Sequence, residues 1–300
     1  MIEARGLSKS FGTVSALEGL TLDVRAGEVF GLLGPNGSGK TTTLRLLLGM
    51  LRPSAGTASV GGHDCWRDGL EVRRVVSYLP GELRLPGAMT SLGLLKFLCA
   101  LRGGSGLDRA VAIAEGVMGL DLRRKVRALS TGMKQKLALA QAFADPVDCL
   151  ILDEPTSALD PSARQLVLGL VDQARAGGQT VVFSGHVLSE VEQVSDRVAI
   201  MRRGRLMRVE DLRELRRSLR LVRVRFRGEA PALYPEALGL SLREADGPVV
   251  LLEHRGEARP LLAWLGSQDV QDVAIGTEGL EALYETYHGP NAESEGKDLV

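Results

Sequence analysis

Short runs of apolar residues recur along the first part of the chain and predict buried strands. They occupy residues 29–33, 149–152, 180–183 and 198–201. Strands that are apolar on both faces are typical of a parallel sheet covered by helices, whereas half-exposed strands alternate between apolar and polar positions. Residues 41–50 instead place leucines at three- and four-residue spacing, which predicts a helix directly after the first strand. The pattern favours an α/β core.

The stretch from residue 84 to about residue 145 has a different pattern. Helical spacing of apolar residues covers 91–101, 108–118 and 133–144, and no convincing strand separates these segments. We therefore expect a helical subdomain inserted into the α/β core.

The last part of the chain changes again. Along residues 221–227 apolar side chains alternate with arginines, which predicts a half-exposed strand. We predict a helix at 232–237, strands at 240–244 and 249–253, a helix at 258–265, a strand at 270–275 and a helix at 280–287. This βαββαβ order is typical of a ferredoxin-like α+β unit. We expect domains at 1–218 and 219–288, followed by a polar, disordered tail at 289–300.

Charge and composition exclude several classes of protein. The chain has 37 basic and 37 acidic residues, is 44% hydrophobic and is 25% charged, which is ordinary for a globular protein. Its net charge of zero gives no overall attraction to nucleic acid. The longest stretch without a charged residue, 176–189, is shorter than the roughly 18 residues of a membrane span. The start of the chain, residues 1–5, lacks the apolar core of a signal peptide, so we expect a protein that stays in the cytoplasm unless something else holds it at a membrane.

The cysteines are expected to be structural. Cys65, Cys99 and Cys149 are scattered, without the paired spacing of a metal site or a disulfide framework. Buried thiols are the simpler interpretation.

One segment matches a phosphate-binding loop at every fixed position of the pattern G-x-x-x-x-G-K-[ST]. It follows a predicted strand and precedes a predicted helix, and it reads Gly34-Pro35-Asn36-Gly37-Ser38-Gly39-Lys40-Thr41. Glycines let peptide N–H groups converge on phosphate oxygens, and the helix N-terminus adds partial positive charge. Lys40 is expected to reach the β- and γ-phosphates, and Thr41 to bind Mg²⁺. A glycine-rich turn without a ligand is the weaker interpretation.

Two adjacent carboxylates follow the apolar run at 149–152. Asp153 at the end of a strand suits Mg²⁺ coordination, and Glu154 beside it can polarise an attacking water. Such a pair alone is often a solvated turn. With the phosphate loop upstream, a catalytic pair is the better interpretation.

The order of motifs resembles ABC transporter ATPases. Leu129-Ser130-Thr131-Gly132-Met133-Lys134-Gln135 is similar to the family's signature segment. The segment Asp153-Glu154-Pro155-Thr156-Ser157-Ala158-Leu159-Asp160 resembles its Walker B and D-loop. Ser184-Gly185-His186 is similar to its switch histidine, and Phe11 matches its adenine-stacking aromatic. A buried strand residue is the alternative for Phe11.

The resemblance implies a P-loop NTPase of ABC type that uses ATP and Mg²⁺. It implies a dimer with two ATP molecules between subunits, in which Ser130 and Gly132 bind the γ-phosphate held by the other subunit. Ala158, Leu159 and Asp160 would lie across the seam, with Glu154 as the base and His186 at the γ-phosphate. The implied nucleotide-binding set is Phe11, Gly34, Pro35, Asn36, Gly37, Ser38, Gly39, Lys40, Thr41, Thr42, Ser130, Gly132 and Asp160.

Two segments depart from the family pattern. The signature has Thr131 and Met133 where the family usually has Gly and Gln, which resembles the subgroup that includes antibiotic and drug exporters. The family also places a Mg²⁺-sensing Gln where this chain has Gly81, followed by Glu82. The metal set expected is therefore Thr41 and Asp153, with either Glu82 or water as a further ligand.

The leading hypothesis is the ATPase subunit of an ABC exporter. It would work with a second ATP-binding subunit and with integral membrane permease subunits, contacted around residues 81–103, and lie at the inner face of the cell membrane. The alternatives are a soluble ABC ATPase acting on nucleic acid or ribosomes, a nutrient importer ATPase and a degenerate regulatory cassette. The arginines between residues 202 and 227 form either a solvated face or a surface for anionic lipid or a partner.

Overall fold

The computed structural model describes residues 1–277, apart from 146, 219 and 232, together with residue 284. These residues form two compact units, Met1–Val209 and a second that begins at Glu210. The predicted tail 289–300 and the predicted helix 280–287, except for residue 284, lie outside the described residues.

A six-stranded sheet in the order β10-β9-β3-β8-β7-β6 forms the centre of the first unit. Its strands are β3 (Val29–Leu33), β6 (Val76–Leu79), β7 (Cys149–Asp153), β8 (Thr180–Gly185), β9 (Arg197–Arg202) and β10 (Arg205–Asp211). The pairs β3–β8, β3–β9, β7–β8 and β6–β7 are parallel. Every residue of β3, β7 and β8 is buried, which confirms the interpretation of the continuous apolar runs.

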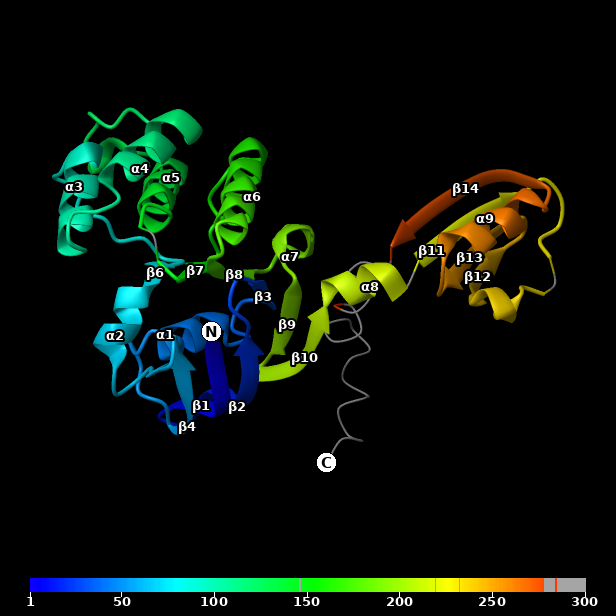
Figure 1. Cartoon of the computed structure of the whole chain (residues 1–300), viewed down its shortest axis with the longest axis horizontal. Coiled ribbons are helices and arrows are strands. Elements are labelled where there is room, and N and C mark those ends of the chain that lie inside the picture. The colour runs from blue at the N-terminus through cyan, green and yellow to red at the C-terminus, as the bar shows by residue number, and fades with distance from the viewer. Residues whose placement is uncertain (146, 219, 232, 278–283, 285–300) are drawn as a thin grey trace. The chain divides into compact units, whose positions relative to one another are not determined.

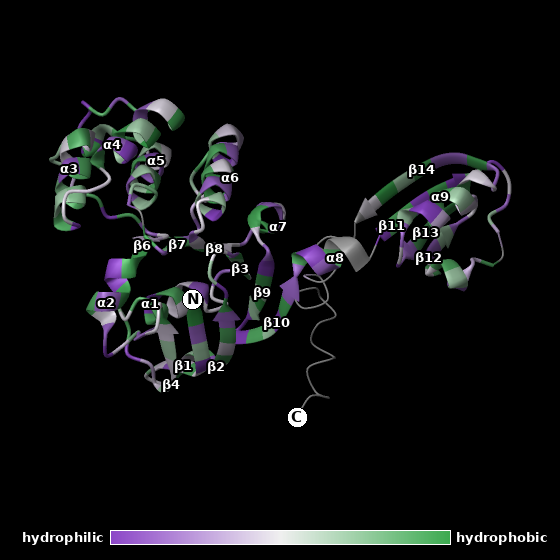
Figure 2. Ribbon diagram, viewed as in Figure 1, coloured by the Kyte–Doolittle hydropathy of each residue, from purple (hydrophilic) through white to green (hydrophobic). Residues whose placement is uncertain are grey.

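A second, antiparallel sheet was not anticipated from the sequence. It has the order β2-β1-β4-β5 and consists of β1 (Ile2–Phe11), β2 (Val14–Val24), β4 (Ala55–Val60) and β5 (His63–Asp64). Register shifts along β1 interrupt its alternation of buried and exposed residues. Figure 2 shows polar and apolar residues alternating along β2, whereas β9 is mostly apolar between its ends.

Helix α1 (Lys40–Leu47) packs between the two sheets. Its Leu44 and Leu47 share one buried cluster with Leu20 of the antiparallel sheet and with Phe30 and Ile151 of the parallel sheet. The helix therefore carries the phosphate loop on a rigid support. Helices α2 (Gly69–Val75), α6 (Pro161–Ala176) and α7 (Leu188–Val194) complete this α/β part.

Residues 84–145 contain helices and no strand, as predicted. The elements are α3 (Ser91–Leu101), α4 (Leu107–Val111), a π-helix (Ala112–Val117), a 3-10 turn (Val126–Ala128) and α5 (Thr131–Ala142). The hydroxyl of Thr90 accepts a hydrogen bond from the N–H of Gly93 and so caps α3. Figure 1 shows these helices grouped beyond the end of β6.

The second unit contains α8 (Leu212–Ser218) and an antiparallel sheet in the order β12-β13-β11-β14. The strands are β11 (Arg220–Phe226), β12 (Leu240–Asp246), β13 (Val249–His254) and β14 (Val270–Thr277), and α9 (Ala258–Gly266) covers one face (Figure 1). Val222, Val224 and Phe226 of β11 are buried against Leu261 and Leu265 of α9.

The predicted helix at 232–237 is wrong. Apart from residue 232, which is not described, this stretch contains only the beginning of a 3-10 turn, Glu236–Leu238. Pro235 lacks the N–H that a helix interior needs, and Leu233 is exposed. The unit therefore has the strand arrangement of a split βαβ sheet, in which β13 separates β11 from β12, but lacks the helix expected between these two strands.

All three cysteines are buried free thiols, as expected. Burial raises the pKa of Cys65 and of Cys149 to about 12. Neither thiol is therefore a reactive nucleophile at neutral pH.

The core of the second unit can be tested at Leu252, which is fully buried on β13. Leu252→Ala should lower the free energy of unfolding of this unit by about 2–5 kcal/mol because it leaves a cavity. The matched control is Leu242→Ala on β12, whose side chain is 50% exposed. Denaturant unfolding followed by Trp264 fluorescence in a Trp66→Phe background isolates this unit, since the chain has two tryptophans. Equal midpoints for the two variants would contradict the assigned core.

Candidate functional site

The loop between β3 and α1 depends on close backbone approaches that glycine permits. A Cβ at Gly34 would lie 2.4 Å from the carbonyl oxygen of Met201. Gly39 has a φ of 102°, and a Cβ there would lie 3.0 Å from the carbonyl oxygen of Ala16. The exposed positions of the loop are Pro35, Asn36 and Gly37. The loop thus presents backbone rather than side chains to an incoming anion.

Lys40 is buried and is held by the loop itself. Its Nζ donates to the carbonyl oxygens of Gly34 at 2.7 Å and Pro35 at 3.3 Å, and lies 3.6 Å from Oε1 of Glu154. The buried hydroxyl of Ser38 has no hydrogen-bond partner within the described part of the chain. A buried ammonium and an unsatisfied hydroxyl in one glycine-rich loop fit a phosphate group.

Asp153 is the centre of a hydrogen-bond network at the carboxyl ends of the strands. Thr41, which with Thr42 lies in the first turn of α1, donates from Oγ1 to Oδ2 of Asp153 at 2.8 Å. Ser184 donates from Oγ to Oδ1 of Asp153 at 2.6 Å. A hydroxyl and a carboxylate that meet in this way provide the oxygen ligands that Mg²⁺ prefers. The site therefore fits the metal expected from the sequence.

Glu154 lies between a cation and an imidazole. Its Oε1 faces Lys40, and its Oε2 lies 3.5 Å from Nδ1 of His186. The residue has a φ of 46°, a left-handed conformation that is costly outside glycine, and its N–H donates to Oγ of Ser184 at 2.9 Å. The strained backbone is thus anchored, and it turns the Glu154 side chain towards the phosphate loop.

Strand β6 and the loop that follows it lie beside Asp153. A Cβ at Gly81 would lie 3.4 Å from Oδ2 of Asp153, so the position that aligns with the family's Gln borders the carboxylate. Burial, together with the charge of Asp153, raises the pKa of Tyr78 to about 12. The side chain of Glu82 is 82% exposed and lies 4.0 Å from Arg84 in a surface ion pair.

The signature segment packs against the D-loop. Ser130 caps α5 by accepting from the N–H of Met133 at 3.2 Å. A Cβ at Gly132 would lie 2.9 Å from the carbonyl oxygen of Ala158, so this glycine is required by close approach. Asp160 caps α6, and the hydrogen bond from the N–H of Ala163 lowers its pKa. The segments predicted for a second subunit's nucleotide thus lie together on one surface.

Phe11 is not a buried strand residue. Its ring is 50% exposed near the end of β1, and Nζ of Lys9 lies 5.0 Å from the ring centroid. An exposed flat ring at this position suits stacking on a base.

Sequence reasoning placed Ser184 in the histidine motif but missed that it holds both Asp153 and Glu154 in place. It also missed Glu190, whose carboxylate accepts from Oγ1 of Thr156 at 2.5 Å and pairs with Arg164 at 3.1 Å. Ser184 directly precedes Gly185-His186, but a serine in a buried strand carries no signal of its own. Only the register that sets Ser184 beside Asp153 reveals its role.

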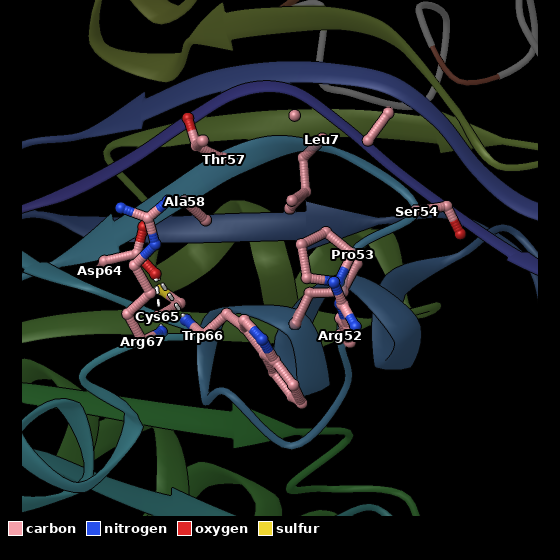
Figure 3. Close-up of a pocket in the computed structure, with 13 residues that line it drawn as sticks. Leu7, Arg52, Pro53, Ser54, Thr57, Ala58, Asp64, Cys65, Trp66 and Arg67 are labelled. Carbon is pink, nitrogen blue, oxygen red and sulfur yellow. Dashed lines mark hydrogen bonds between the residues drawn. The ribbon is translucent and has the colours of Figure 1, made fainter.

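A hollow of about 240 Å³ lies at the other end of α1, near Leu46 (Figure 3). Its lining includes Arg52 and Trp66, and the Asp64 carboxylate accepts from the N–H groups of Trp66 and Arg67 at 3.0 and 2.8 Å. None of the predicted site residues lines it, so the phosphate loop and not this hollow is the candidate site.

The arginines between residues 202 and 227 are divided between the two units. Arg205 pairs with Glu18 at 2.7 Å in the first unit, whereas Arg220 of the second unit donates to the carbonyl oxygen of Gly256. Arg223 and Arg225 are exposed on β11. The arginines therefore have separate environments.

Within the described part of the chain, no helix combines the length and apolar character needed to cross a membrane.

Comparisons with known proteins agree with the motif order. The family profile described as ABC transporter matches residues 17–157. The daunorubicin/doxorubicin resistance ATP-binding protein DrrA of Streptomyces peucetius is 32% identical, over 97% of this chain and 93% of that protein. The Nod factor export ATP-binding protein I of Burkholderia lata is 37% identical, over 68% of each chain. A solved ATP-binding subunit of an ABC transporter is 28% identical, with a TM-score of 0.66 over 72% of this chain and 92% of that one.

The role of Ser184 can be tested without a ligand. Ser184→Ala removes the donor to Asp153 and the acceptor for the Glu154 N–H inside a buried network. It should lower the free energy of unfolding by about 1–3 kcal/mol. The control, Ser157→Ala at an exposed position, should stay within about 0.5 kcal/mol of the parent in the same denaturant titration. A Ser184 variant as stable as the control would show that the network contributes nothing to the fold.

Proposed function

Because this chain belongs to the ABC transporter family, as a subunit that binds and hydrolyses ATP, we propose that it powers export by separate membrane subunits. The observation that carries the proposal is the convergence of Lys40, Thr41, Asp153, Glu154 and His186 at one edge of the parallel sheet.

The phosphate loop holds the nucleotide in this proposal. Its N–H groups and the N-terminus of α1 bind the phosphate oxygens, and Lys40 exchanges its two loop carbonyls for the β- and γ-phosphates. Thr41 and Asp153 would hold Mg²⁺, which when bound would supply positive charge beside the phosphate oxygens. The exposed ring of Phe11 stacks on the adenine.

Glu154 and His186 act on the hydrolytic step. Glu154 accepts a proton from the attacking water, since its carboxylate is already directed towards the phosphate loop beside Lys40. His186, whose ring is about half exposed, contacts the γ-phosphate and keeps Glu154 in position through its Nδ1. Ser184 fixes the backbone of Glu154 and one oxygen of Asp153.

Two subunits enclose the nucleotide. Ser130 and Gly132 at the start of α5 offer a hydroxyl and an N–H to the γ-phosphate bound by the other subunit. Ala158, Leu159 and Asp160 lie across the seam, beside the signature segment with which they pack. Closure on ATP and opening after hydrolysis then move the segment around residues 81–103, which contacts the permease.

Export is favoured over the alternative functions by two kinds of support. DrrA is named as a resistance protein, and the Nod factor relative as an export protein. The signature segment has Thr131 and Met133, as in the exporter subgroup that it resembles, and this also supports export. The intact Lys40, Asp153 and Glu154 argue against a purely regulatory cassette. The proposed location is the cytoplasmic face of the cell membrane, where the permease holds the chain.

The further Mg²⁺ ligand is proposed to be Glu82 or water. Gly81 leaves space beside Asp153 where the family has a Gln side chain. Glu82 would have to leave its exposed ion pair with Arg84 to reach the metal.

The assigned base is tested by Glu154→Gln, which keeps the size of the side chain and removes its basicity. ATP binding should persist, and the rate of phosphate release should fall by roughly 10²–10⁴-fold. Glu71→Gln, in an exposed ion pair with Arg74 on α2, is the control and should hydrolyse ATP at the parent rate. ATP binding and the rate of phosphate release are both measured on the purified chain with ATP and Mg²⁺. Unchanged turnover in Glu154→Gln would overturn the assignment.

A further inference from the structure

The second unit has a sheet face that α9 does not cover. We call it the open face; it carries the side chains of β11, β12 and β13 that point away from the buried cluster of Val222, Val224 and Leu252. A hollow of about 460 Å³ on this face is lined by Arg223, Arg225, Glu244, Asp246, Val249 and Leu251.

The strand register arranges these six residues as two rows of the same design. Arg225 pairs with Val249, which pairs with Asp246, and Arg223 pairs with Leu251, which pairs with Glu244. Each row therefore runs from a basic residue on β11 through an apolar residue on β13 to an acidic residue on β12. We call them the charged rows.

The arginine and the carboxylate of each row remain separate within the chain, although Asp272 of β14 lies opposite Arg225 on the other side of β11. The basic and acidic strands are two strand spacings apart, roughly 9.5 Å, with β13 between them. Within the described residues, no ion pair joins Arg223 or Arg225 to Glu244 or Asp246. An ion pair does form between the adjacent strands β12 and β13, where Arg243 and Glu253 lie 3.7 Å apart. Arg223, Arg225, Glu244 and Asp246 are exposed, while Val249 and Leu251 are only half-buried.

A surface of this kind is complementary to itself. Rotation by 180° about an axis along β13 places the basic strand of one copy over the acidic strand of the other, row by row. Val249 and Leu251 then meet the same residues of the second copy, and so does Glu253 of β13, whose carboxylate is paired with Arg243 of its own chain. Rotation about an axis across the strands would instead oppose like charges, which disfavours it. The charges thus select one of the two symmetric arrangements.

We propose that the open face binds a second copy of this chain through the charged rows, with β13 along the two-fold axis. The hollow gives the long arginine side chains of the partner space to reach Glu244 and Asp246. Sheets that pack face to face lie about 10 Å apart, which matches this mode of contact. The contact needs no nucleotide and is therefore separate from the ATP-dependent closure proposed above.

The size of the face sets the expected strength. The three strands that overlap in this arrangement, β12, β13 and β11, present roughly 300 Å² per copy, less than half of what a standard stable interface buries on each partner. We therefore expect weak association of the nucleotide-free chain, with a dissociation constant between about 10 μM and 1 mM. Sedimentation equilibrium over this range of protein concentration measures it.

The test reverses each side of the rows in the full chain. One double variant, Arg223→Glu with Arg225→Glu, makes the row positions on both β11 and β12 acidic; the other, Glu244→Arg with Asp246→Arg, makes these positions basic on both strands. Each alone should associate at least about tenfold more weakly than the parent, and an equimolar mixture should form heterodimers. Recovery in the mixture excludes misfolding as the cause of the loss.

Two controls locate the contact. Arg255→Glu with Arg259→Glu changes the net charge equally at positions outside the sheet strands, and should leave association unchanged. Leu251→Cys should be joined to its copy by a bis-maleimide of about 10 Å span, whereas Leu262→Cys, exposed on α9, should not be.

Several results would overturn the proposal. These are a parent chain that stays monomeric at about 1 mM without nucleotide, double variants that associate like the parent, or a mixture that does not recover. Loss of binding to anionic phospholipid vesicles by the Arg223 and Arg225 variant, with a monomeric parent, would assign the arginines to a membrane surface instead.

Discussion

The hydrogen bond from Thr41 to Asp153 is the contact on which the site depends, because it joins residues 112 positions apart in the sequence. It forms because β3, β8 and β7 are neighbours in a parallel sheet, so that their carboxyl ends meet at one edge. The phosphate loop, the two acids and the switch histidine each follow one of these strands. Strand order therefore turns three separate motifs into one phosphate and metal site.

Buried polar contacts extend this arrangement away from the nucleotide. Gln135 in helix α5 donates to the carbonyl oxygen of Pro155, directly after Glu154, the proposed base. Glu190 on α7 binds Thr156 and Arg164, and so connects the switch region to the D-loop and α6. Because buried polar groups are costly to leave unpaired, these contacts tie the segments proposed to bind ATP to those proposed to meet a second subunit.

The second unit has a simpler construction. One helix, α9, covers one face of its sheet. Between β11 and β12, where a second helix was expected, the described residues form only a short 3-10 turn. The opposite face keeps arginines, carboxylates and half-buried aliphatic residues in matching rows. An antiparallel sheet can be stable with one face towards solvent, so fold stability does not require these rows to be covered. Their regularity is explained by recognition.

The sequence by itself determined the phosphate loop, the paired acids, the motif order of the family, the continuous apolar strands and the helical character of residues 84–145, including α3 at its observed bounds. These features are local, since periodicity reports burial and glycine spacing reports backbone geometry. Tertiary structure decided what depends on distant partners. The antiparallel sheet is hidden by bulges in β1, and Ser184 gains its role only from the strand beside it. The charged rows exist because register aligns three strands, whereas a single strand shows only alternation. Pairing between remote segments cannot be read from one segment, because its pattern records whether a residue is buried but not which residue lies opposite.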